Sequence, residues 1–64
     1  MELAVIIPLS HFLTNINEYK TFDVTWEKYG EDEMVCDIEV SEDDYQAYMD
    51  SQLTTFEILE QYAS

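Results

Sequence analysis

Residues 22–45 read FDVTWEKYGEDEMVCDIEVSEDDY, and this stretch decides the fold. In its first part the apolar residues Phe22, Val24 and Trp26 alternate with polar ones, and a second alternating run begins at Met34. Such alternation is typical of a strand with one buried face. Gly30 and the acidic residues after it are typical of a turn. The sequence therefore predicts an antiparallel hairpin of two strands, residues 22–29 and 34–40.

The second predicted strand has side chains of contrasting character on its two faces. The inward set is Met34, Cys36, Ile38 and Val40, and the outward set is Val35, Asp37 and Glu39. The hairpin is therefore expected to have one apolar face and one acidic face.

Upstream of the hairpin, the apolar run Leu3–Ile7 ends at Pro8. Its β-branched residues and the proline favour a short buried strand. Ser10 is placed to cap a following helix, whose apolar residues recur near helical spacing at Phe12, Leu13, Ile16 and Tyr19 or Lys20. A single longer N-terminal helix is the alternative.

Downstream, Ser41 fits a helix N-cap and Asp44 occupies the capping-box position. Thr54 and Glu57 form a second possible capping box, so the C-terminal region is either one bent helix or two short ones. Its apolar residues form a stripe at helical spacing, comprising Tyr45, Tyr48, Met49, Leu53, Phe56 and Leu59.

These elements predict an α+β fold in the order β-α-β-β-α, a single domain over residues 1–64. A small antiparallel hairpin sheet, with the N-terminal strand as a possible third member, would be packed by one to three short helices. A domain of 64 residues buries only about 60% of the surface of its unfolded chain. We expect a homodimer, because the C-terminal stripe together with Trp26 offers more apolar surface than one sheet face covers.

Charge restricts the class of partner. The chain has 15 acidic residues against Lys20 and Lys28, and its net charge is −13. Nucleic acids and anionic membranes would repel it, so the expected partner is a basic protein surface.

Residues 1–12 have no basic start, contain Glu2 and are interrupted at Pro8, which is unlike a signal peptide. No apolar run is long enough to span a membrane. A soluble, cytoplasmic protein is expected.

Catalytic chemistry is not indicated, and we expect neither an enzyme nor a bound cofactor. Catalysis needs groups with contrasting roles in one pocket, whereas the chain has one cysteine and one histidine. Cys36 is expected to be a small buried residue and His11 a surface residue near a helix start. The acids Glu31, Asp32, Glu33 and Asp37 lack the spacing of a calcium-binding loop, so no metal site is predicted.

The acids are more informative as a geometric array. Residues 23–50 contain eleven of them against one lysine. Outward residues two apart on a strand lie about 6.6–6.8 Å apart, close to the roughly 6–7 Å between successive phosphates of a wound DNA strand. The array predicted to imitate a row of phosphates comprises Asp23, Glu27, Glu31, Asp32, Glu33, Asp37, Glu39, Glu42, Asp43 and Asp44. The alternative is an acidic face that serves solubility alone.

Residues 22–48 have a recognisable layout of predicted elements. FDVT begins a strand, an acidic turn and a second strand follow, and SEDDY begins a helix. This order is similar to the layout of the short dimeric uracil-DNA glycosylase inhibitors. Small size, extreme acidity, aromatic content and the lack of catalytic groups also resemble the wider class of phage-encoded DNA-mimic inhibitors, which includes anti-CRISPR and anti-restriction proteins. The resemblance implies that acidic side chains replace DNA phosphates and that the target is a DNA-binding enzyme of the bacterial host. This chain differs in its longer apolar N-terminus, residues 1–20.

Two functional hypotheses follow. In the first, the protein is a DNA mimic that occupies the basic channel of a host defence or repair enzyme, with Tyr29, Tyr45 and Tyr48 as exposed aromatic anchors. In the second, it is a small acidic assembly subunit that contacts a basic partner through the apolar helix stripe, without mimicry.

Overall fold

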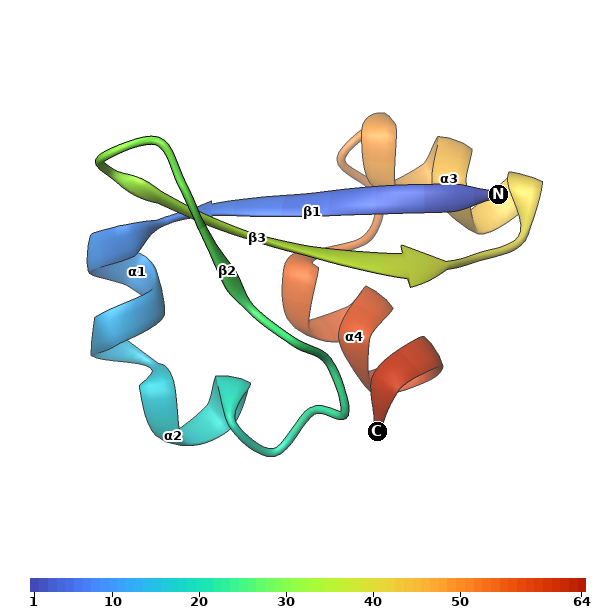
Figure 1. The fold of residues 1–64 in the computed structure, drawn as a ribbon. Helices are drawn as coiled ribbons and strands as arrows, with labels where there is room; N and C mark the ends of the chain where they lie inside the picture. The colour runs from blue at the N-terminus through green and yellow to red at the C-terminus, as the bar shows by residue number, and fades with distance from the viewer.

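The computed structural model describes residues 1–64. Its elements are β1 (Glu2–Pro8), α1 (Leu9–Thr14), α2 (Ile16–Tyr19), β2 (Glu27–Tyr29), β3 (Glu33–Glu39), α3 (Glu42–Met49) and α4 (Thr55–Ala63). The strands form one antiparallel sheet in the order β1-β3-β2 (Figure 1). The predicted α+β class is confirmed. The N-terminal strand is also confirmed, and it pairs with β3 along its full length.

The helices are more numerous than the one to three predicted. The N-terminal region forms α1 and α2 in place of one helix, because the chain breaks at Asn15, whose side-chain amide donates to the His11 carbonyl. The C-terminal region is two helices, separated by a segment in which Ser51 has a φ of 61°. The Thr54–Glu57 capping box is present at the start of α4.

Ser10 does not cap the first helix. The helix begins one residue earlier, at Leu9, with Pro8 in the N-cap position and no side-chain cap. The Leu9 N–H donates instead to the carbonyl oxygen of Asp32 at 2.7 Å. A backbone group from the hairpin turn therefore satisfies one of the unpaired donors at this helix start, and this contact joins α1 to the turn.

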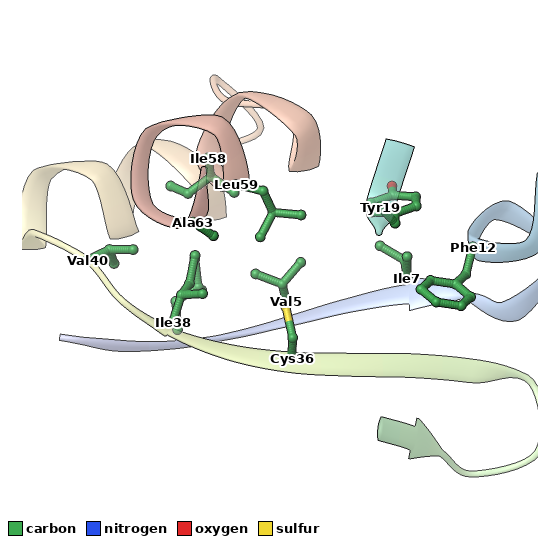
Figure 2. Close-up of a cluster of buried hydrophobic side chains, with 11 residues drawn as sticks. Val5, Ile7, Phe12, Tyr19, Cys36, Ile38, Val40, Ile58, Leu59 and Ala63 are labelled. Carbon is green, nitrogen blue, oxygen red and sulfur yellow. The ribbon is translucent and has the colours of Figure 1, made fainter. Parts of the chain in front are cut away.

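The core lies on one face of the sheet, between β1 and β3 on one side and the helices on the other (Figure 2). Leu3 pairs with Ile38 and Val5 with Cys36, and all four side chains are buried. In the predicted inward set, Cys36, Ile38 and Val40 are buried and Met34 is half-buried. In the outward set, Asp37 and Glu39 are exposed, whereas Val35 is half-buried. Helix α4 contributes Ile58, Leu59 and Ala63 to this core.

The predicted strand over residues 22–29 is correct only for its last three residues. Residues 22–26 keep the expected alternation of burial but pair with no strand, because their apolar side chains join an aromatic cluster. We define this aromatic cluster as Phe12, Tyr19, Phe22, Trp26 and Phe56. The Asp23 N–H also donates to the Ala63 carbonyl at 2.5 Å. Side-chain packing and this bond draw the chain away from β3 before Glu27.

Tyr19 is the centre of the aromatic cluster and is fully buried. Its ring stacks on Phe56 with centroids 4.7 Å apart and meets Trp26 edge-on at 5.4 Å. Trp26 belongs to the cluster although its buried indole N–H has no hydrogen-bond acceptor. An unpaired donor of this kind costs about 1–3 kcal/mol, so aromatic packing outweighs that loss and fixes the course of residues 22–26.

Alkaline pH is expected to destabilise the fold through the ionisation of two buried side chains, the Cys36 thiol and the Tyr19 hydroxyl. Burial raises the pKa of the Cys36 thiol from 9.0 to about 12, with a smaller contribution from Asp37, and burial also raises the pKa of Tyr19 from 10.0 to about 12. In the unfolded chain both groups ionise at their ordinary pKa. The stability they contribute is therefore complete below pH 9 and is lost as the pH rises from 9 toward 12.

Urea unfolding at a series of pH values from 7 to 11 tests this expectation, with Cys36→Ala as the comparison. The substitution is expected to cost roughly 1 kcal/mol at neutral pH through lost packing. It should also delay the alkaline loss until tyrosine ionisation near pH 10. An identical pH profile for the wild type and Cys36→Ala would show that the thiol is not the group responsible.

Candidate acidic groove

The departure of residues 22–26 from the sheet leaves a groove beside the C-terminal half of β3. In Figure 1 the chain between α2 and β2 runs well apart from this end of β3. The groove has a volume of about 520 Å³. Its lining residues are Asp23, Val24, Thr25, Glu27, Asp37, Ile38, Glu39, Tyr62 and Ala63.

Four of the predicted site residues meet at this groove. Asp23 and Glu27 come from the departing segment, and Asp37 and Glu39 come from β3. No lysine lines it, and all four side chains are exposed. We call the site of these four carboxylates the acidic groove. It is a concave surface on which all the charged side chains are negative. Such a surface focuses the electrostatic potential and attracts a cationic partner.

The first turn of helix α3 contains further acids of the predicted row. Glu42 and Asp43 follow the end of β3 closely and are exposed in the first helical turn. Ser41 caps the helix as predicted, because its Oγ accepts from the Asp44 N–H at 3.2 Å. Neither Glu42 nor Asp43 is needed for this cap, so both side chains are free to face a partner.

Asp44 has a structural role that the capping pattern did not indicate. Its carboxylate does not accept a hydrogen bond from the Ser41 N–H, because the Tyr62 hydroxyl oxygen accepts that bond instead. The single Tyr62 hydroxyl proton goes to the Asp44 carboxylate, and the hydroxyl oxygen accepts from the Ser41 N–H at 3.2 Å. Gln61 Nε2 donates to the same carboxylate at 2.8 Å. The contact spans 18 residues in sequence and joins α3 to the end of α4 beside the groove.

Removing the Tyr62 hydroxyl is expected to destabilise the fold in a pH-dependent way. The Tyr62 hydrogen bond is the main reason that the pKa of Asp44 lies below its ordinary 3.8, with Ser41 and Gln61 adding to the effect against partial desolvation. A lowered folded-state pKa stabilises the fold above pH 3.8, and this contribution is lost as the pH falls through the folded value.

Tyr62→Phe should therefore lower the free energy of unfolding at pH 7, and the difference from wild type should shrink below pH 3.8. Chemical denaturation at pH 7 and pH 3 measures both quantities. Tyr29→Phe, which removes a hydroxyl from an exposed side chain, is the control. A Tyr62→Phe difference that does not change with pH would contradict the assigned hydrogen bond to Asp44.

The turn acids lie apart from the acidic groove. Glu31 and Asp32 are in the turn that begins at Gly30, whose φ of 67° is readily adopted only by glycine. Glu33 opens β3, so six residue steps, or roughly 20 Å, separate it from Glu39. The structure therefore divides the predicted row into a groove end and a turn end.

The three predicted tyrosine anchors differ in exposure. Tyr29 is 51% exposed on β2, opposite Glu33. Tyr45 and Tyr48 are half-buried against the core, and the Tyr48 hydroxyl lies 3.3 Å from Thr55 Oγ1. The expectation of an exposed aromatic anchor therefore holds for Tyr29 alone, since the fold uses most of the surface of the other two.

The apolar helix stripe is largely inside the molecule. Leu59 is fully buried, and Leu53 and Phe56 pack against the core, which leaves Met49 as its exposed member at 51%. An uncovered stripe was the reason for expecting a homodimer and for the assembly-subunit hypothesis. That reason no longer holds, because the stripe covers the sheet of its own chain. The dimer stays a prediction, which sedimentation velocity tests.

The single cysteine and the single histidine both lie against residues of the core or of the aromatic cluster. Cys36 is buried on the inward face of β3, as predicted. His11 Nε2 lies 2.7 Å from the Tyr19 hydroxyl, and its ring lies against the edge of the aromatic cluster. No three His, Cys, Asp or Glu side chains are grouped so that they could hold a metal ion. None of the helices has the length and apolar character needed to cross a lipid bilayer.

Comparison of the chain with protein-family models, with curated proteins and with solved structures gives no significant match.

Proposed function

We propose that this protein is a DNA-mimic inhibitor. It binds the basic nucleic-acid-binding surface of a bacterial host enzyme, such as a CRISPR-Cas effector, a uracil-DNA glycosylase or a restriction enzyme, and blocks access to DNA. The proposal places the protein in the bacterial cytoplasm, where such enzymes act. It is a binding protein and needs no cofactor.

The observation that carries the proposal is the convergence of Asp23, Glu27, Asp37 and Glu39 around one groove that has no lysine in its lining. Asp37 and Glu39 lie on the same face of a strand, about 6.6–6.8 Å apart. This separation is close to that of neighbouring phosphates on one DNA strand, on the order of 6–7 Å. Glu42 and Asp43 extend the row beyond the end of β3.

Electrostatics favours this use of the acids over a purely solubilising one. Like charges gathered on one surface repel each other and reduce stability, so a scattered arrangement would serve solubility at a lower cost in free energy. A gathered arrangement accelerates association with a basic partner, at rates that fall with ionic strength. The exposed Tyr29 ring adds an apolar contact next to the turn acids.

Capture from a bacterial lysate tests the proposal. The immobilised protein is expected to retain a DNA-binding enzyme that duplex DNA then releases. The purified enzyme should lose binding to a labelled duplex when the protein is added in equimolar amount. Capture of partners that duplex DNA does not displace would refute the mimicry and favour an assembly role.

A further inference from the structure

The C-terminal half of β3 has an unpaired backbone edge inside the acidic groove. Pairing between β2 and β3 ends at Glu27↔Val35, although β3 continues to Glu39. Sequence alternation predicted that residues 22–26 would continue this pairing. They join the aromatic cluster instead, so the position of a neighbouring strand beside residues 36–39 is taken by the groove.

Antiparallel geometry shows which backbone groups face that position. The Val40 N–H donates to the Met1 carbonyl and the Met1 amine donates to the Val40 carbonyl, so the backbone of Val40 faces β1. Both polar groups of a residue point to the same side, and the side alternates along the strand. Ile38 and Cys36 therefore also face β1, whereas Asp37 and Glu39 direct their N–H and C=O groups toward the groove.

We propose that the acidic groove binds an extended polypeptide segment of the partner, with lysine or arginine at alternate positions, as an added strand on β3. Backbone hydrogen bonds to Asp37 and Glu39 would provide the strand pairing. Cationic side chains opposite these two residues lie on the same sheet face as their carboxylates, and Asp23 and Glu27 line the other side. The inference goes beyond the proposed function, because phosphate imitation needs only acidic side chains and not the backbone of β3.

Charge selects the occupant. A second copy of this chain would bring its own acids against those of the groove, since the net charge is −13, so a homotypic strand is disfavoured. The other free edge of the sheet, on β1, ends at Pro8, which has no N–H to donate.

A peptide probe tests the proposal directly. The acetylated and amidated peptide Lys-Val-Lys-Val-Lys is titrated into isotope-labelled protein in low salt, and amide exchange is followed by NMR. Slower exchange of the Asp37 and Glu39 amides by at least about tenfold is expected. The control peptide has the same sequence with every backbone nitrogen methylated, and it should bind at least about tenfold more weakly. Equal binding of the two peptides would show attraction by charge alone and overturn the proposal.

A matched pair of variants tests the same bond from the protein side. Glu39→Ala and Glu39→Pro both remove the carboxylate, but only the proline removes the N–H. Proline is tolerated at an unpaired edge, and Ile38 before it already has the extended conformation that proline requires. Glu39→Pro is expected to bind the peptide about fivefold more weakly than Glu39→Ala, the effect of one net hydrogen bond. Equal affinity in two folded variants would overturn the proposal.

The results separate the added strand from DNA mimicry. If a captured enzyme is released by DNA and binds the two Glu39 variants equally, the strand is refuted while the proposed function stands. If the peptide protects Asp37 and Glu39 but no DNA-displaceable enzyme is captured, the added strand is supported and the proposed function fails.

Discussion

Replacing Asp37, Glu39, Glu42 and Asp43 together by their amides is expected to weaken target binding more than tenfold in low salt. Close charge pairs across an interface couple by roughly 1.5 kcal/mol or more, and about 1.4 kcal/mol corresponds to a tenfold change in affinity. One such pair among the four acids is therefore enough. Binding of the captured enzyme, measured by titration calorimetry or competition with labelled DNA, gives the result.

Stability should change little or rise in this fourfold variant. These four carboxylates accept none of the side-chain hydrogen bonds of the fold, which use Asp44, Asp50 and Glu57. Removing four gathered charges also relieves self-repulsion. A control variant, Glu18→Gln with Glu60→Gln, removes two charges from exposed positions outside the groove and should leave affinity nearly unchanged.

Salt dependence provides a second check on the same variants. The affinity difference between wild type and the fourfold variant should shrink as ionic strength rises, because the wild-type interaction is increasingly screened. Unchanged binding by the folded fourfold variant in low salt would mean that the acidic surface serves solubility, and the mimic hypothesis would be wrong.

Tyr19→Ala is expected to have the largest effect on stability. Removing a fully buried aromatic ring costs about 3–5 kcal/mol. A chain of 64 residues has a total stability of only about 3–10 kcal/mol. The ring contacts four other aromatic side chains of the cluster, so the substitution should remove about a third or more of the total stability. Far-ultraviolet circular dichroism and urea titration measure the loss.

Two further variants separate the Tyr19 ring from its hydroxyl and from aromatic content in general. Tyr19→Phe keeps the stacking on Phe56 and loses only the contact between the hydroxyl and His11 Nε2, so a cost of about 0.5–1.5 kcal/mol is expected. Tyr29→Ala, at an exposed site, should stay within about 0.5 kcal/mol of wild type. A cost below 1 kcal/mol for Tyr19→Ala would contradict the central place of this ring.

Local patterns in the sequence determined much of the fold. The period-two alternation over Met34–Val40 correctly predicted which side chains of β3 are buried, and the apolar run before Pro8 correctly predicted β1. Ser41 and Thr54 correctly marked the starts of α3 and α4. These features were predictable because burial alternation and helix capping depend on residues within a few positions of each other.

Tertiary packing decided the shape of the candidate site. Alternation in Phe22, Val24 and Trp26 is the same whether these side chains pack on a sheet or in an aromatic cluster, so the pattern alone could not show that the chain leaves β3. The cluster forms around Tyr19 and includes Phe56, which is distant in sequence from residues 22–26. Likewise, Asp44 belonged to the predicted acidic row, but its carboxylate accepts a hydrogen bond from Tyr62, which is 18 residues away in sequence.

The sequence by itself determined the α+β class and the acidic character of the outer face of β3, since composition and short-range periodicity are sufficient for these. Only the tertiary structure decided that Asp23, Glu27, Asp37 and Glu39 surround one groove and that the backbone of β3 is unpaired within it. The physical reason is a competition between strand pairing and aromatic packing for residues 22–26, in which burial against Tyr19 prevails over additional hydrogen bonds to β3.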